Sequence, residues 1–155
     1  MPLFSSFSQL KQAIEKQTEK ALQDDVSRVI KEGLQTHVLD NIYNASSPKN
    51  YERTYELLRS IEVGNVKKNG NVFEVQVYFN PNFTHESWYG SKKLGINAGE
   101  KISMTYIAQW LDEGKNIFTP HTEGFIDDTV GELEVTKKHV TAFIGYLKSK
   151  GIIIR

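Results

Sequence analysis

A long amphipathic helical pattern near the N-terminus constrains the fold of this chain more than any other feature. Between positions 8 and 43, apolar residues recur mostly at steps of four or seven, the spacing of one helix face. This face carries Leu10, Ile14, Ala21, Val26, Ile30, Leu34, Val38 and Ile42. The hydroxyls of Ser5, Ser6 and Ser8 can cap the start of the helix. The sequence therefore predicts a helix over Ser8–Tyr43.

This helix is longer than a globule of the chain's size. About 36 residues rising ~1.5 Å each make a rod of roughly 54 Å. A globule of 155 residues is only about 30 Å across. Two interpretations remain open: part of the helix projects and needs a partner, or two helices meet at a break near Asp24-Asp25. Gln17 and Thr18 interrupt the apolar face, so we expect the first two turns to stand apart from the core.

The middle of the chain predicts a β-hairpin. Two strand-like runs, 61–68 and 71–79, flank Asn69-Gly70, a pair that suits the two positive-φ positions of a type I′ turn. The second run alternates, which places four apolar side chains on one face. These are Phe73, Val75, Val77 and Phe79.

The register of this hairpin requires a bulge. With a two-residue turn, Glu62 would fall on the apolar face of the hairpin. A bulge at Gly64-Asn65, with both residues opposite Glu74, returns Ile61 and Val63 to that face. Glycine inside a strand is typical of bulges. A ladder running unbroken through this region would contradict the prediction.

The rest of the chain adds short helices and a long loop. A short helix is expected over 51–59, and 80–101 reads as a polar, glycine-bearing loop of unusual length. A helix over 104–113 begins after Ser103 and ends at Gly114, with Ile107, Trp110 and Leu111 buried. The last helix is expected to be capped by Asp127 or Asp128 and to end near Lys150. Its apolar positions are Val130, Leu133, Val140, Ile144 and Leu147.

These elements predict a single α+β domain over 1–155. We expect a small antiparallel sheet with a central β-hairpin, packed against the long N-terminal helix and a C-terminal helix. After Gly151, the apolar residues 152–154 read as a short strand that pairs with the hairpin or with a neighbouring subunit.

Composition excludes several classes of function. The chain has no cysteine, so disulfides, thiolate nucleophiles and cysteine metal sites are excluded. Its 19 basic and 19 acidic residues balance, which argues against a dedicated nucleic-acid binder. No apolar run approaches the ~18 residues of a membrane span, and the start of the chain lacks a signal-type pattern. We expect synthesis in a cytoplasm and no membrane partner.

The residues that could carry catalysis do not form a recognisable motif. His37, His85, His121 and His139 are not at metal-ligand spacing. There is no phosphate-binding loop and no nucleophile elbow. His85-Glu86 and His121 leave open a general acid–base site, but solvated loop residues explain them as well. We therefore predict no catalytic residue, no metal, no cofactor and no enzymatic activity.

Protein contact is the predicted role of the aromatic and terminal apolar residues. Tyrosine, tryptophan and arginine dominate protein interfaces. The candidate interface residues are Tyr51, Arg53, Tyr55, Trp88, Tyr89, Ile152, Ile153 and Ile154. Packing within the chain is an equally good interpretation for Tyr51 and Tyr55. Lys92-Lys93 beside Trp88 leaves room for a passive contact with DNA.

Several stretches together resemble a known family. They are NIYNA at 41–45, PKNYERTYELLRSI at 48–61 with the hairpin after it, YIAQWLDEG at 106–114 and GFIDD at 124–128. Their order resembles the neck proteins of long-tailed bacteriophages, also called tail-completion or tail-to-head joining proteins. Members often have Arg-Pro-Phe before the last helix, where this chain has Glu123-Gly124-Phe125.

The resemblance implies a virion structural protein. It implies an α+β fold, assembly into a ring, commonly sixfold, and head-completion and tail-tube proteins as partners. The expected locations are the virion and, during assembly, the host cytoplasm. The resemblance leaves open whether the source is an active phage or a prophage. Two other classes stay open: a small hydrolase or nuclease using His85, Glu86 or His121, and an adaptor that binds a host protein through the long helix.

Overall fold

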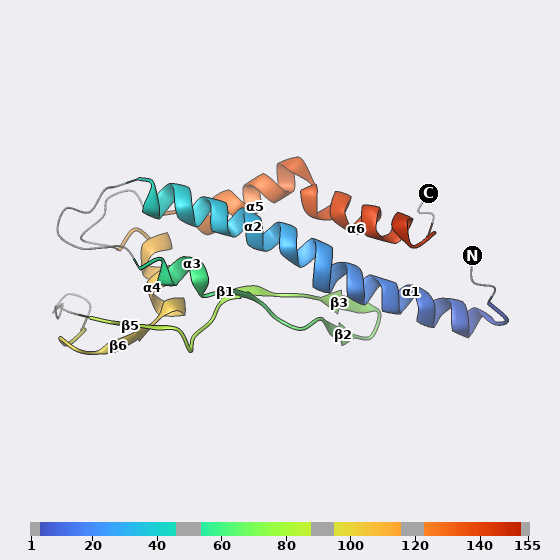
Figure 1. Ribbon diagram of the computed structural model, residues 1–155, viewed down its shortest axis with the longest axis horizontal. Helices are drawn as coiled ribbons and strands as arrows, with labels where there is room; N and C mark the ends of the chain where they lie inside the picture. The colour runs from blue at the N-terminus through green and yellow to red at the C-terminus, as the bar shows by residue number, and fades with distance from the viewer. Residues whose placement is uncertain (1–3, 46–53, 88–94, 116–122, 153–155) are drawn as a thin grey trace. The chain divides into compact units, whose positions relative to one another are not determined.

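The computed structural model confirms a mixed α+β fold and describes residues 4–45, 54–87, 95–115 and 123–152 (Figure 1). The chain divides into two compact units. Unit 1 comprises residues 1–33, 63–77 and 130–155, and unit 2 comprises 34–62 and 78–129. The single domain over 1–155 stays a prediction.

The N-terminal segment is helical without a break from Phe7 to Tyr43 (Figure 1). Helix α1 (Phe7–Ala21) continues through a π-helical turn η1 (Leu22–Val26) into α2 (Ser27–Val38), and a second π turn η2 (Leu39–Tyr43) follows. Ser6 caps the start, because its hydroxyl accepts a hydrogen bond from the Gln9 amide. The predicted helix is confirmed, and a break near Asp24-Asp25 is wrong.

The π turn η1 replaces the expected break for a steric reason. Ala21 and Val26 are both buried, at 0% and 5% exposure, yet they are five residues apart. A regular helix would rotate Val26 away from the face of Ala21, whereas one extra residue in the turn brings it back. The Ser27 hydroxyl donates to the carbonyls of Gln23 and Asp24 in this turn. The apolar face therefore continues through the turn.

The first half of α1 leaves its apolar residues exposed. Phe7 is 82% exposed, Leu10 37% and Ile14 40%. Burial begins at Ala21, so the first turns have no packed apolar face within the described residues. This agrees with the expectation from the interruption at Gln17 and Thr18; projection of the helix stays a prediction.

In unit 1, α6 (Lys138–Ser149) packs against α1 and η1. Leu147 is the buried residue of α6. The Tyr146 hydroxyl donates to Gln17 Oε1 at 3.3 Å, which fixes α6 to α1.

The hairpin of unit 1 turns one residue later than predicted. Strand β2 (Lys67–Asn69) pairs with β3 (Val72–Glu74) in the register Asn69↔Val72. The turn is therefore Gly70-Asn71, and Asn69-Gly70 as a type I′ turn is wrong. Gly70 has φ +61°, whereas Asn71 is not among the residues with positive φ. Positive φ at the first central residue alone is the pattern of a type II′ turn.

A bulge interrupts the ladder, as predicted, but one residue further along. The Gly64 amide donates to the Gln76 carbonyl at 2.8 Å, and pairing resumes at Lys67↔Glu74. Between these two points, the first strand has two residues, Asn65-Val66, and the second has only Val75. The predicted position, Gly64-Asn65 opposite Glu74, was wrong because it assumed the earlier turn.

The predicted apolar face of the second strand is confirmed. Its four alternate residues are buried or half-buried, and the residues between them are exposed. Strand β4 (Val77–Phe79) pairs with β1 (Ile61–Val63), and Ile61 and Phe79 belong to the core of unit 2.

Unit 2 contains a second ribbon in the segment expected to be a loop. Strand β5 (Thr84–Glu86) pairs with β6 (Lys101–Ser103) in the register His85↔Ile102. A loop over all of 80–101 is therefore wrong at 84–86 and 101. The strand escaped prediction because Thr-His-Glu lacks the apolar alternation that signals a strand.

Helix α4 (Met104–Asp112) follows this ribbon directly. Ser103 caps α4 as predicted, by accepting from the Tyr106 amide. Gly114, at φ +66°, ends it. The residues expected in the core, Ile107, Trp110 and Leu111, are only half-buried, and Met104 and Ala108 are buried instead. The helix is thus turned relative to the expectation.

The core of unit 2 forms around two phenylalanines. The rings of Phe79 and Phe125 meet edge to face with centroids 6.1 Å apart, and Phe125 is fully buried. The Thr105 hydroxyl donates to the Phe79 carbonyl at 2.6 Å, which fixes α4 to β4. The other buried apolar residues of the unit are Leu34, Val38, Ile42, Leu57, Ile61, Met104 and Ala108.

The predicted last helix is two helices. Helix α5 (Phe125–Thr136) and α6 are separated at Lys137, whose φ of 54° is left-handed. The capping residue was also predicted wrongly: Asp112 Oδ1 accepts from the Ile126 amide at 2.9 Å. Asp127 and Asp128 lie inside the first turn instead, where their charges favour the helix dipole.

Candidate functional site

Only two of the predicted interface residues fall within the described part of the chain. Tyr51, Arg53, Trp88, Tyr89, Ile153 and Ile154 lie outside the described residues, as do Lys92-Lys93 and His121. Ile152 is half-buried, and its amide donates to the Leu147 carbonyl at the end of α6. The strand predicted at 152–154 therefore lies mostly outside the described residues.

Tyr55 forms an aromatic stack on unit 2. Its ring lies 4.6 Å from that of Tyr43 between centroids, with 24° between the planes. Tyr43 ends η2, and Tyr55 stands just before α3 (Glu56–Arg59) with a left-handed φ of 56°. Such a backbone costs on the order of 1 kcal/mol or more in a bulky residue. Tyr55 is still 40% exposed, so the stack leaves aromatic surface uncovered among the described residues.

His85, on β5, interacts with Glu56 at the start of α3. His85 Nδ1 lies 2.8 Å from Glu56 Oε2, and both side chains are more than one-third exposed. This contact joins the β5–β6 ribbon to α3. Glu86 is the next residue of the strand, so its side chain points to the opposite face from His85. The structure therefore does not bring His85 and Glu86 together as an acid–base pair.

The described residues contain no group of three or more metal-ligating side chains. His37 and His139 are both half-buried on helices. Within these described ranges, no helix is long and apolar enough to cross a membrane.

A shallow hollow of about 270 Å³ lies beside α4 in unit 2. Tyr106 and Trp110 stand one helical turn apart along it, with ring centroids 4.2 Å apart. Tyr106 is 47% exposed. The hollow is lined by Gly95, Ile96, Glu100, Lys101, Ile102, Ser103, Tyr106 and Trp110. It offers an aromatic surface and no convergent set of reactive groups among these residues.

An ion pair closes the end of α4. Lys115 Nζ contacts Glu113 Oε2, and Gln109 Nε2 donates to Glu113 Oε1 at 2.8 Å. The hydrogen bond from Lys115, followed by that from Gln109, lowers the pKa of the Glu113 carboxyl. The same bond raises the pKa of Lys115. Both charged groups are exposed, so their effect is local.

The Gln23 side chain connects the π turn η1 to the bulged strand of unit 1, a contact that the sequence did not predict. Gln23 Nε2 donates to the Gly64 carbonyl at 3.2 Å, and the Val66 amide donates to Gln23 Oε1 at 3.0 Å. The side chain thus bonds the bulged strand at both ends of the bulge. The five-residue step from Ala21 to Val26 is the sequence signal that marks this turn.

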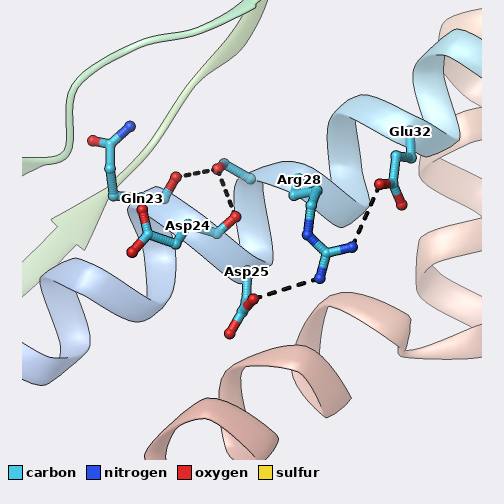
Figure 2. A network of polar contacts seen from close by, with 6 residues as sticks. Gln23, Asp24, Asp25, Arg28 and Glu32 are labelled. Carbon is cyan, nitrogen blue, oxygen red and sulfur yellow. Dashed lines mark hydrogen bonds and ion pairs between the residues drawn. The ribbon is translucent and has the colours of Figure 1, made fainter.

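The same π turn and the start of α2 carry a charge network (Figure 2). Arg28 lies 3.4 Å from Asp25 and 3.4 Å from Glu32. All three side chains are exposed by at least one-third, so these pairs contribute little to stability. This network reads as a solvated helix face.

Charged side chains border the exposed apolar residues of α1. Lys68 Nζ lies 2.6 Å from Glu15 Oε2, and Lys11 lies 4.0 Å from Glu15 Oε1. The hydrogen bond from Lys68 lowers the pKa of Glu15. Two ammonium groups therefore share one carboxylate beside Leu10 and Ile14.

Comparison with known proteins gives one family. A sequence model of the family described as YomN matches residues 6–149. The name comes from a Bacillus prophage region and indicates a phage-associated protein. No curated protein and no solved structure matches.

Proposed function

The chain belongs to the YomN family, and from this premise we propose that it is a virion structural protein acting at the phage head–tail interface. It completes or joins the tail by ring-like assembly of identical subunits. The observation that carries the proposal is the family match over 6–149, whose phage-derived name agrees with the motifs at 41–61 and 106–128.

The exposed aromatic and apolar surfaces support a role in assembly. Phe7, Leu10 and Ile14 on α1, and the Tyr43–Tyr55 stack, offer apolar area of the kind that protein interfaces bury. The proposed partners are other copies of the chain, head-completion proteins and tail-tube proteins. The proposed locations are the virion and the host cytoplasm during assembly, with only passive contact to DNA in the channel.

We also propose that the protein works without catalysis. The separation of His85 from Glu86 on opposite faces of β5 supports this view. A His85→Gln variant removes the imidazole that acid–base catalysis would need and keeps a hydrogen-bonding side chain at this position. It should support phage production as well as the unchanged protein does.

Deletion of the gene from its phage tests the proposed role. Electron micrographs of the lysate should show complete heads and complete tails that are not joined. Expression of the protein from a plasmid should restore joined particles, and the His85→Gln variant should restore them equally. Joined, infectious particles from the deletion phage would refute the head–tail role, and failure of the His85→Gln variant alone would favour a hydrolase or nuclease.

A further inference from the structure

The first half of α1 presents an apolar stripe with a basic edge. Phe7, Leu10 and Ile14 are spaced by three and four residues, so they share one side of this 15-residue helix. Lys11 borders the stripe and is 55% exposed. Its neighbours Glu15 and Lys68 form a close pair, so the three charges leave this edge positive.

A second surface in the same unit is apolar and has a carboxylate at its edge. On α5, Val130 is 48% exposed, Leu133 is half-buried one turn later, and Glu134 is exposed beside them. Glu132 lies on the other side of α5 and is bound by Lys138, so Glu134 is the carboxylate that borders Val130 and Leu133. This surface is therefore apolar with one carboxylate at its edge, which complements Lys11 beside the stripe on α1.

We propose that the α1 stripe of one copy docks on the Val130–Leu133 surface of a second copy, with Lys11 facing Glu134. The inference rests on the proposed function, because it names the surfaces through which identical subunits assemble. Two different surfaces are joined, so the contact is head to tail and can repeat around a ring. Pairing of two α1 stripes would instead bring two positive edges together.

The expected contact is weak when it occurs once. About three side chains on each side cover far less than the ~1,200 Å² that a stable interface buries. The test must therefore capture a brief contact rather than a stable dimer. The absence of cysteine from the sequence makes site-specific cross-linking direct, because every introduced thiol is unique.

The experiment mixes two full-length single-cysteine variants, Leu10→Cys and Val130→Cys, with a short bismaleimide. Cross-linked heterodimers should form at least about fivefold faster than with the control pair Leu10→Cys and Val135→Cys. Val135 lies on the same helix, roughly 140° around from Val130, and is more exposed at 85%. Random collision would therefore favour the control pair.

A charge exchange tests the partner of Lys11. Adding Lys11→Glu to the Leu10→Cys chain should reduce cross-linking, and adding Glu134→Lys to the Val130→Cys chain should restore it. Lys16→Glu, on the other side of α1, should have no effect. Circular dichroism melting of each variant checks that it is folded. If Lys11→Glu had simply unfolded α1, the second substitution Glu134→Lys would not restore cross-linking.

Each outcome decides the proposal. Equal rates for the Val130→Cys and Val135→Cys pairs would overturn it, as would dominant Leu10→Cys homodimers, which would mean an α1–α1 contact. If cross-linking fails while the gene deletion still leaves heads and tails apart, only the docking surface is wrong. If cross-linking succeeds and the deletion phage forms joined particles, the self-contact stands and the head–tail role fails.

Discussion

Gln23→Ala should destabilise the protein by about 1–3 kcal/mol. The substitution removes two hydrogen bonds, to the Gly64 carbonyl and from the Val66 amide, each worth about 0.5–1.5 kcal/mol. The affected groups are part-buried, so water can replace only some of the lost bonding. For a chain of this size, a loss of 2 kcal/mol lowers Tm by about 4–8 °C.

Urea unfolding followed by circular dichroism measures this change, with Gln12→Ala as the matched control. Gln12 is an exposed glutamine on α1, so its substitution should change stability by less than about 0.5 kcal/mol. Amide hydrogen exchange gives a local readout, because the Val66 amide should exchange faster in Gln23→Ala only. If Gln23→Ala unfolds at the same urea concentration as Gln12→Ala, the proposed clamp on the bulge does not exist.

Substitutions at three further positions probe other parts of the structure. The hydrogen bond from Lys68 lowers the pKa of Glu15 from 4.5, so the pair stabilises the fold above pH 4.5 and loses this effect as the pH falls through the lowered pKa. Urea titrations should therefore show Lys68→Met less stable than the unchanged protein above pH 4.5. The difference should vanish once the pH is below the lowered pKa. Lys137 has a left-handed φ of 54°, so Lys137→Gly should leave Tm unchanged or raise it, whereas Lys137→Val should cost about 1–2 kcal/mol. Phe125→Ala empties a fully buried site and should cost about 3–5 kcal/mol in chemical denaturation; a loss below 1 kcal/mol would mean that Phe125 is not in a core.

The helical elements could be predicted because their signals are local. The periodic apolar face identified the helix over 8–43, and Ser103 and Gly114 marked the ends of α4, because a cap and a positive-φ glycine act within one turn. The left-handed Lys137 has no such signal. A lysine there reads as an ordinary helical residue, so α5 and α6 were predicted as one helix.

The candidate surfaces were predictable only in part. Packing of Tyr55 within the chain, one of the two interpretations of this residue, is confirmed by its stack with Tyr43, and its role at an interface stays a prediction. The stack of Tyr55 with Tyr43 joins two segments that are separated along the chain, and no local sequence pattern predicts such a pair. The Asp112 cap of α5 was missed for the same reason, since Asp127 and Asp128 offered a nearer candidate.

The bulge in the hairpin combines a feature predicted from strand alternation with a contact from a distant residue, Gln23. A bulge was required because alternation had to place Ile61 and Val63 on the apolar face, and this argument uses only the hairpin's own residues. The amide of Gln23, some forty residues earlier, is hydrogen-bonded to Gly64 and Val66 on either side of Asn65. That amide reaches the strand from the π turn, which itself exists because Ala21 and Val26 must share a buried face. One side chain therefore connects the extra residue in the helix to the extra residue in the strand. The step from Ala21 to Val26 marks the first within its own segment, whereas the second was misplaced because the hairpin turn was predicted one residue too early.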